Sequence, residues 1–243
     1  MAIKRGLIAA IAIVLFAGGN ILILFISTNL LWGELEARLF TQLIGAGKLK
    51  LECPLLIAPW ETAAIRTTVT NDVADQSTKP QVNAFISRDP EPRVVSQTLE
   101  LSPLESQSLE WTVDAADIVF DRLILVSVVQ RPYRDLETRQ GSCSIYVFTL
   151  FDMSGRDTFL VLVALGILAS VLGLGLLYHA FRPLSERMTR ITQITAIFLL
   201  LVLAGLLSAV PRYWGLTLAF NAGAVLVITV ANVEILFAPK KRE

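Results

Sequence analysis

The chain has 243 residues, of which 54% are hydrophobic and 17% are charged, and its mean hydropathy is +0.61. Soluble domains carry about a quarter charged residues, so these values exclude an ordinary soluble protein and indicate an integral membrane protein. The 21 basic and 21 acidic residues balance, which gives no reason to expect nucleic-acid binding, and one histidine with two cysteines excludes a histidine-rich or four-thiolate metal site.

Four apolar stretches divide the chain, and they lie at residues 6–32, 158–179, 191–210 and 214–238. Each has the roughly 20 residues needed to cross the hydrocarbon layer, where the backbone must pair internally, so each is predicted to be a helix. The first stretch follows Lys4 and Arg5 but is longer than the apolar region of a cleavable signal sequence. Residues 1–32 are therefore predicted to be an uncleaved signal anchor, and residues 157–243 a three-helix transmembrane region.

Basic residues are distributed unevenly around these stretches. Lys4 and Arg5 precede the first, whereas only Arg212 lies between the third and the fourth. The others lie between the second and third stretches or after the fourth, and they are Arg182, Arg187, Arg190, Lys240, Lys241 and Arg242. The positive-inside rule predicts four spans, cytoplasmic termini and an extracytoplasmic segment over residues 33–156. No N-x-S/T sequon occurs, which fits a bacterial plasma membrane.

The extracytoplasmic segment begins as a helix and continues as strands. Leucines spaced by four residues extend the first helix to about residue 44, and Gly45 and Gly47 then turn the chain, so residues 33–47 are a juxtamembrane helix and turn. Alternation of apolar and polar residues predicts seven strands, at 49–55, 62–70, 81–87, 95–101, 108–113, 121–130 and 142–150. We therefore expect an antiparallel β-sandwich over residues 48–156, whose first and last strands run in the same direction.

Four motifs stand out in residues 62–113: Ile65-x-Thr67-x-Val69-x-Asn71, Val82-x-Ala84-x-Ile86, Leu99-x-Leu101-x-Pro103-x-Glu105 and Leu109-x-Trp111-x-Val113. Together they resemble bacterial cell-adhesion-related Ig-like domains, which usually have a strand closing in Asn and a Pro-Gly-Glu turn before a strand with a buried aromatic residue. Leu104 stands where the glycine of that turn is usual. The resemblance implies an Ig-like sandwich inserted between the first and second helices, and a role in presentation or binding rather than catalysis.

The two cysteines fall in the first and last predicted strands, Cys53 and Cys143. An oxidising compartment favours a disulfide between them, and the first and last strands of Ig-like sandwiches can lie side by side. The alternative is two buried free thiols.

Two candidate functional sites carry polar side chains. The connection 131–141 contains residue types that are enriched in interface hot spots, namely Arg131, Tyr133, Arg134 and Arg139. We predict an interaction loop there, with a solvated hairpin loop as the alternative. Glu234 is the one acidic residue inside a predicted span, so it is either an intramembrane polar site or a side chain that reaches the cytoplasmic interface.

Small residues recur at four-residue spacing in the predicted spans. The second span carries the pairs Gly166/Ser170 and Ala169/Gly173, and the fourth carries Gly215, Ala219 and Gly223. Such residues let helices approach closely. The pattern predicts either packing of the three C-terminal helices against one another or docking to a neighbouring subunit, and it does not choose between them.

The motifs of phosphate-binding loops, zinc proteases, serine hydrolases and haem attachment do not occur in the sequence. We therefore expect a non-enzymatic protein without a metal or cofactor, which contacts the lipid bilayer and either other subunits of a membrane complex or further copies of itself. The main prediction is an accessory or scaffold subunit that presents the sandwich for protein–protein interaction. The alternatives are a transport or ion-conducting component using Glu234 and an extracytoplasmic sensor acting through a partner.

Overall fold

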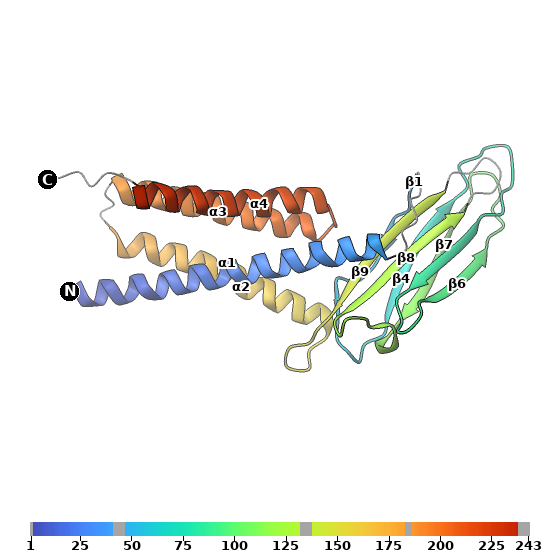
Figure 1. Cartoon of the computed structure of the whole chain (residues 1–243), viewed down its shortest axis with the longest axis horizontal. Coiled ribbons are helices and arrows are strands. Elements are labelled where there is room, and N and C mark those ends of the chain that lie inside the picture. The colour runs from blue at the N-terminus through green and yellow to red at the C-terminus, as the bar shows by residue number, and fades with distance from the viewer. Residues whose placement is uncertain (1, 41–46, 132–137, 183–185, 238–243) are drawn as a thin grey trace. The chain divides into compact units, whose positions relative to one another are not determined.

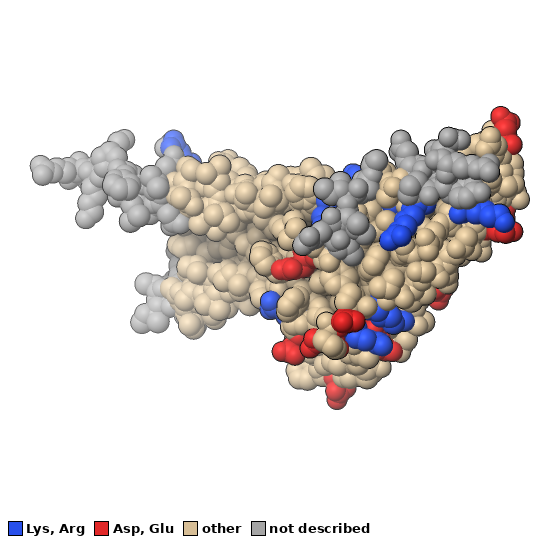
Figure 2. Space-filling view, turned by 45° about the vertical axis from the view of Figure 1, so that its right-hand side comes forward, with Lys and Arg blue, Asp and Glu red and all other residues tan. Residues whose placement is uncertain are grey.

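The computed structural model describes residues 2–40, 47–131, 138–182 and 186–237 (Figure 1). The chain divides into two compact units. The helical unit comprises Met1–Leu31 and Leu160–Glu243, and the β-unit comprises Trp32–Phe159. Figure 2 shows that most of the visible helical unit is covered by uncharged side chains, whereas acidic and basic side chains are interspersed on the β-unit.

The described residues contain four helices, α1 (Ala2–Leu39), α2 (Gly155–Ala180), α3 (Glu186–Ala209) and α4 (Trp214–Phe237). Three of them contain segments long and apolar enough to cross a membrane, which are Gly6–Leu39, Gly155–Ala180 and Met188–Ala209. In α4 the shorter segment Trp214–Val230 is apolar. These helices fit a membrane protein.

Helix α1 is continuous from the helical unit into the β-unit. The structure assigns its last helical residue to Leu39, which is earlier than the predicted end near residue 44. A bend follows at Phe40, whose backbone N–H still donates to the carbonyl of Glu36 at 2.9 Å, and residues 41–46 lie outside the described part of the chain. Leucine spacing indicates helical periodicity but carries no signal for the residue at which a helix stops.

The described part of the β-unit contains nine strands and one short 3-10 helix. They are β1 (Gly47–Lys48), β2 (Leu51–Glu52), β3 (Leu56–Ile57), β4 (Ala63–Thr70), β5 (Gln81–Ile86), β6 (Arg93–Thr98), β7 (Ser106–Val113), the 3-10 helix Ala115–Asp117, β8 (Leu123–Arg131) and β9 (Arg139–Val147). The predicted count of seven strands is wrong because the stretch 49–55 does not form one strand. The chain there moves between two sheets, and Pro54 has no N–H to donate to a ladder.

The strands form two sheets. The larger has the order β1-β9-β8-β5-β6, with β3 also paired to β9, and the smaller has the order β2-β4-β7. Both β1 and β3 run parallel to β9. This agrees with the prediction that the first and last strands run in the same direction. The larger sheet is therefore mixed, and the expectation of a wholly antiparallel arrangement is wrong.

One apolar core lies between the two sheets. The smaller sheet contributes Ile65 and Trp111, and the larger contributes Val82, Ile124 and Ile145. These residues alternate with polar or outward-facing neighbours along each strand, which is the period-two pattern of a sheet with one face in a core.

The last turns of α1 cover the outer face of the larger sheet. A Cβ atom at Gly33 would lie 2.5 Å from Ser144 Oγ and 2.9 Å from the Tyr146 ring, so only glycine fits this approach. Ala37 is fully buried on the same side of the helix. Burial raises the pKa of the Tyr146 hydroxyl, and the nearby Arg122 and the backbone of Gly33 offset part of this rise.

The last turns of α1 and the start of α2 connect the β-unit to the rest of the chain, and both lie near the second half of β9. Gly33 contacts Ser144 and Tyr146, and Gly155, the first residue of α2, lies against the backbone of Ile57. We call this end of the β-unit, where β9 finishes and α2 begins, the helix end. The opposite end is where β8 finishes and β9 begins.

Candidate functional site

Cys53 and Cys143 form a disulfide, with their Cα atoms 6.6 Å apart, so the predicted bond is confirmed. Cys143 lies in β9 as expected, but Cys53 lies between β2 and β3 rather than inside a strand. The bond therefore ties the segment that crosses between the two sheets to β9.

The predicted interaction loop is only partly described. Arg131 is the exposed last residue of β8, and Arg139, the first residue of β9, pairs with Asp72 next to the end of β4. Tyr133 and Arg134 lie outside the described residues. The structure thus places Arg131 and Arg139 at the opposite end of the β-unit, and it gives Arg139 a structural ion pair.

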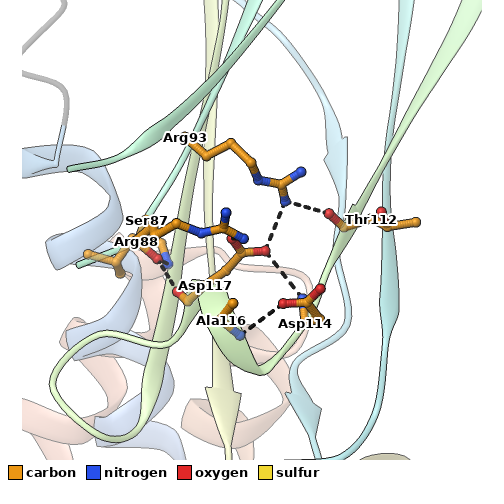
Figure 3. Close-up of polar contacts among 8 residues, drawn as sticks. Ser87, Arg88, Arg93, Thr112, Asp114, Ala116 and Asp117 are labelled. Carbon is orange, nitrogen blue, oxygen red and sulfur yellow. Dashed lines mark hydrogen bonds and ion pairs between the residues drawn. The ribbon is translucent and has the colours of Figure 1, made fainter. Parts of the chain in front are cut away.

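A polar cluster that the sequence analysis did not identify lies at the helix end (Figure 3). Its centre is the carboxylate of Asp117, which is completely buried. One carboxylate oxygen accepts a hydrogen bond from Arg88 at 3.0 Å, and the other accepts bonds from Arg93 at 2.8 Å and from the backbone N–H of Asp114 at 3.2 Å.

Hydrogen bonds between side chains and backbone join this cluster to β7 and β8. Arg93 also donates to the carbonyl oxygen of Thr112 in β7 at 2.7 Å. Ser87 donates its hydroxyl to the carbonyl oxygen of Asp117 at 2.7 Å and accepts from the Leu125 N–H in β8 at 2.9 Å. The cluster therefore holds the β5–β6 connection, the 3-10 helix and both sheets in one arrangement.

The local sequence contains one signal for this cluster. Asp114 and Asp117 form a capping box, in which the Asp114 side chain accepts from Ala116 N–H while Asp117 reaches back to the Asp114 N–H. The two arginines that complete it lie more than 20 positions earlier in the chain. Because both carboxylate oxygens are occupied by donors, we assign the cluster a structural role.

The small residues of the second apolar stretch lie against α1 within the helical unit. A Cβ atom at Gly166 would lie 2.8 Å from Ile23, and one at Gly173 would collide with the backbone of Phe16. Ser170 is fully buried and lies next to Gly19. The three residues Gly166, Ser170 and Gly173 are thus on the face of α2 that contacts the N-terminal helix α1, whereas contact among the three C-terminal helices was predicted.

The small residues of the fourth stretch have different surroundings. Gly215 and Ala219 are exposed, and no atom lies within 4 Å of a Cβ placed at Gly215. A Cβ at Gly223 would make an ordinary 3.8 Å contact with Leu201 of α3. Helix α4 is instead joined to its neighbours by Asn221, which donates to Ser27 at 3.2 Å, and by a 3.0 Å hydrogen bond between Ser208 and Thr217. The side chain of Glu234 lies outside the described residues.

The α1–α2 contact predicts a difference between two glycines of the same helix. Gly173→Ala is expected to weaken helix packing by about 1–3 kcal/mol, because the added methyl group must displace the α1 backbone. Gly175→Ala is the matched control, since nothing lies within 4 Å of a Cβ there. The midpoint of unfolding in mixed detergent and SDS micelles, followed by circular dichroism, should fall for the first variant only. Equal midpoints would contradict this packing.

Comparisons with known proteins identify no family. No protein-family model and no curated protein matches the sequence. Among solved structures, part of a Paenibacillus cycloisomaltooligosaccharide glucanotransferase is similar, with a TM-score of 0.35 and 15% identity over 44% of this chain and 15% of that one. A CARDB domain from Pyrococcus furiosus, in complex with di-metal ions, has a TM-score of 0.32 and 11% identity over 42% of this chain and 93% of that one. The Pseudomonas fluorescens alkylpurine DNA glycosylase AlkC has a TM-score of 0.30 and 12% identity over 42% and 31%. These likenesses are weak, and no function is transferred from them.

Proposed function

We propose that the chain is a non-enzymatic membrane protein that presents an Ig-like β-sandwich to other subunits of a membrane complex. In this proposal all four helices span a bacterial plasma membrane, both termini are cytoplasmic and the β-unit is extracytoplasmic. Three sufficiently apolar helices and a disulfide, which persists in oxidising compartments, support it. The basic residues that flank the spans favour this orientation.

The observation that carries the proposal is the attachment of both helical connections at one end of the β-unit. Gly33 packs on the second half of β9, and Gly155 packs on β3, which pairs with that half. Arg131 and Arg139 lie at the other end of the β8–β9 pair. Nine residues of β9 correspond to about 30 Å at ~3.3 Å per residue. A rigid unit held at one end in this way is suited to present its opposite end to a partner.

The proposal is tested by native mass measurement of the full chain, extracted in a mild detergent. We expect species heavier than the monomer, and we expect Arg131→Ser to reduce their fraction. Arg66→Ser is the matched control, because Arg66 is an exposed arginine on the smaller sheet that pairs with Glu110. A monomer without any bound subunit in the unsubstituted protein would refute the scaffold role.

A further inference from the structure

Three β-turns at the helix end each carry an aromatic side chain at the tip. We call them the aromatic turns, and their central residues are Pro59-Trp60, Phe120-Asp121 and Phe151-Asp152. Each is closed by a backbone hydrogen bond, from Glu61 N–H to Ala58 O at 3.0 Å, from Arg122 N–H to Val119 O at 3.3 Å and from Met153 N–H to Leu150 O at 3.1 Å.

The three aromatic side chains are unusually exposed for their size. Trp60 is 56% exposed, Phe120 is 68% exposed and Phe151 is 88% exposed. Single exposed apolar residues are common on protein surfaces. Here three exposed aromatic tips from separate parts of the chain, together with Phe148 at 45%, lie at one end of the β-unit. Exposed apolar residues that gather on one part of a surface are common at interaction sites.

Two of these turns also hold phenylalanine in a disfavoured backbone conformation. Phe120 has a φ of 53° and Phe151 has a φ of 51°, and the aspartate that follows each is also left-handed. Asn, Asp and Gly adopt this region readily, whereas it is unfavourable for a bulky aromatic residue. Phenylalanine at these tips therefore lowers the stability of the fold without filling its core, which indicates a role outside the fold.

The three turns are fastened either to the start of α2 or to the end of β9, the strand that precedes it. A carboxylate oxygen of Glu61 accepts from the N–H of Ala58 at 2.6 Å and from the N–H of Gly155 at 2.9 Å, which ties the Trp60 turn to the first residue of α2. Val147 N–H donates to Arg122 O at 2.9 Å, which ties the Phe120 turn to the end of β9. The Phe151 turn is itself the link between β9 and α2.

We propose that the aromatic turns insert into the interfacial layer of the lipid bilayer and anchor the helix end of the β-unit to the membrane surface. Tryptophan is enriched in this layer, and phenylalanine is buried at the same depth by helices that lie on membrane surfaces. The chain from Phe151 to Thr158 spans at most about 20 Å, so the apolar part of α2 is close by. The inference rests on the membrane assignment in the proposed function.

The charges beside the aromatic turns indicate the kind of lipid surface. The basic residues beside the turns are Arg122 and Arg156. They are outnumbered by acidic ones, namely Glu61, Asp121, Asp152 and Asp157, so basic residues do not cluster there. Attraction to anionic lipid needs clustered basic residues. Insertion therefore depends on the aromatic side chains, and it takes place in zwitterionic bilayers as well as in anionic ones.

The test uses nitroxide spin labels on the full chain in phosphatidylcholine vesicles, with and without phosphatidylglycerol. Single cysteines are introduced by Phe120→Cys and Phe151→Cys, and the native cysteines do not react because they are paired. The matched control is Leu104→Cys. Leu104 is also an apolar turn residue with positive φ and 65% exposure, but its turn joins the smaller sheet at the opposite end.

We expect the ratio of oxygen to nickel-complex collisions to be higher at residues 120 and 151 than at residue 104, in both kinds of vesicle. High nickel-complex accessibility at 120 and 151 would overturn the proposal. Low accessibility to both reagents would indicate a protein contact and would also overturn it. A label at Leu165→Cys, on the exposed face of α2, should show a high ratio of oxygen to nickel-complex collisions, as expected in lipid. A low ratio, as expected in water, would refute the membrane assignment itself.

A second measurement leaves both phenylalanines in place. In a Trp32→Phe/Trp214→Phe background, brominated phosphatidylcholine should quench the emission of Trp60, whereas Trp111 is buried in the core and is spared. Adding Trp60→Phe should abolish the quenching. Quenching of equal size with and without Trp60 would overturn the proposal, and an unchanged melting temperature shows that each variant is folded.

Discussion

Loss of the Cys53–Cys143 bond is expected to destabilise the β-unit by about 4 kcal/mol, because the bond links residues 90 positions apart and restricts the unfolded chain. The effect is largest in the double variant Cys53→Ser/Cys143→Ala. Alanine is chosen at position 143 because that side chain is fully buried and a hydroxyl group there would need a partner. The melting temperature of the full chain in detergent, measured by near-ultraviolet circular dichroism, should fall by more than about 10 °C.

The unsubstituted protein supplies the control for this experiment. Adding a reductant should lower its melting temperature towards that of the double variant, and the same reductant should not affect the variant. If the double variant melts at the temperature of the oxidised protein, the bond contributes nothing to the stability of the β-unit. That outcome would contradict the chain-entropy argument.

Replacing Asp117 by alanine is the second substitution with a large expected effect. The buried carboxylate neutralises part of the charge of Arg88 and Arg93 and accepts from the Asp114 N–H, so its removal leaves guanidinium groups without their anion. We expect a loss of about 3 kcal/mol, at the low end for a buried ion pair because both arginines are partly exposed to solvent. Chemical denaturation followed by circular dichroism measures it.

Two neighbouring substitutions separate charge from capping in the Asp117 cluster. Asp117→Asn keeps an acceptor but removes the charge. Its free energy of unfolding should lie between those of the native protein and Asp117→Ala. Asp114→Ala removes only an exposed cap, so about 1 kcal/mol is expected. Losses of equal size at positions 114 and 117 would show that the ion pairs do not stabilise the fold.

The long strands and the apolar helices were predictable because each has a local signal. The segments predicted at 62–70 and 81–87 are β4 and β5 within one residue at each end, since period-two alternation over six to eight residues is read within the segment itself. The disulfide was also predictable, because only one pairing of two cysteines exists. The stretch 49–55 was misread because alternation does not show which sheet a residue pairs with.

The polar cluster and the aromatic turns were missed for a related reason. Arg88 and Arg93 have many acidic residues within reach along the chain, and only the fold selects Asp117 as their common partner. Phe120-Asp121 and Phe151-Asp152 lack the Asn-Gly or Asp-Gly signal of a left-handed turn. Their conformation is imposed by the strands and the helix that they connect.

The sequence by itself determined the apolar helices, the alternating strands and the cysteine pair, because hydropathy and periodicity act over a few neighbouring residues. Only the tertiary structure decided that β1 and β3 lie parallel to β9, that Gly166 and Gly173 contact α1, and that three aromatic turns share one end. These features depend on register and close approach between segments tens of residues apart. No local pattern specifies such partners, so they follow from the packing of the folded chain.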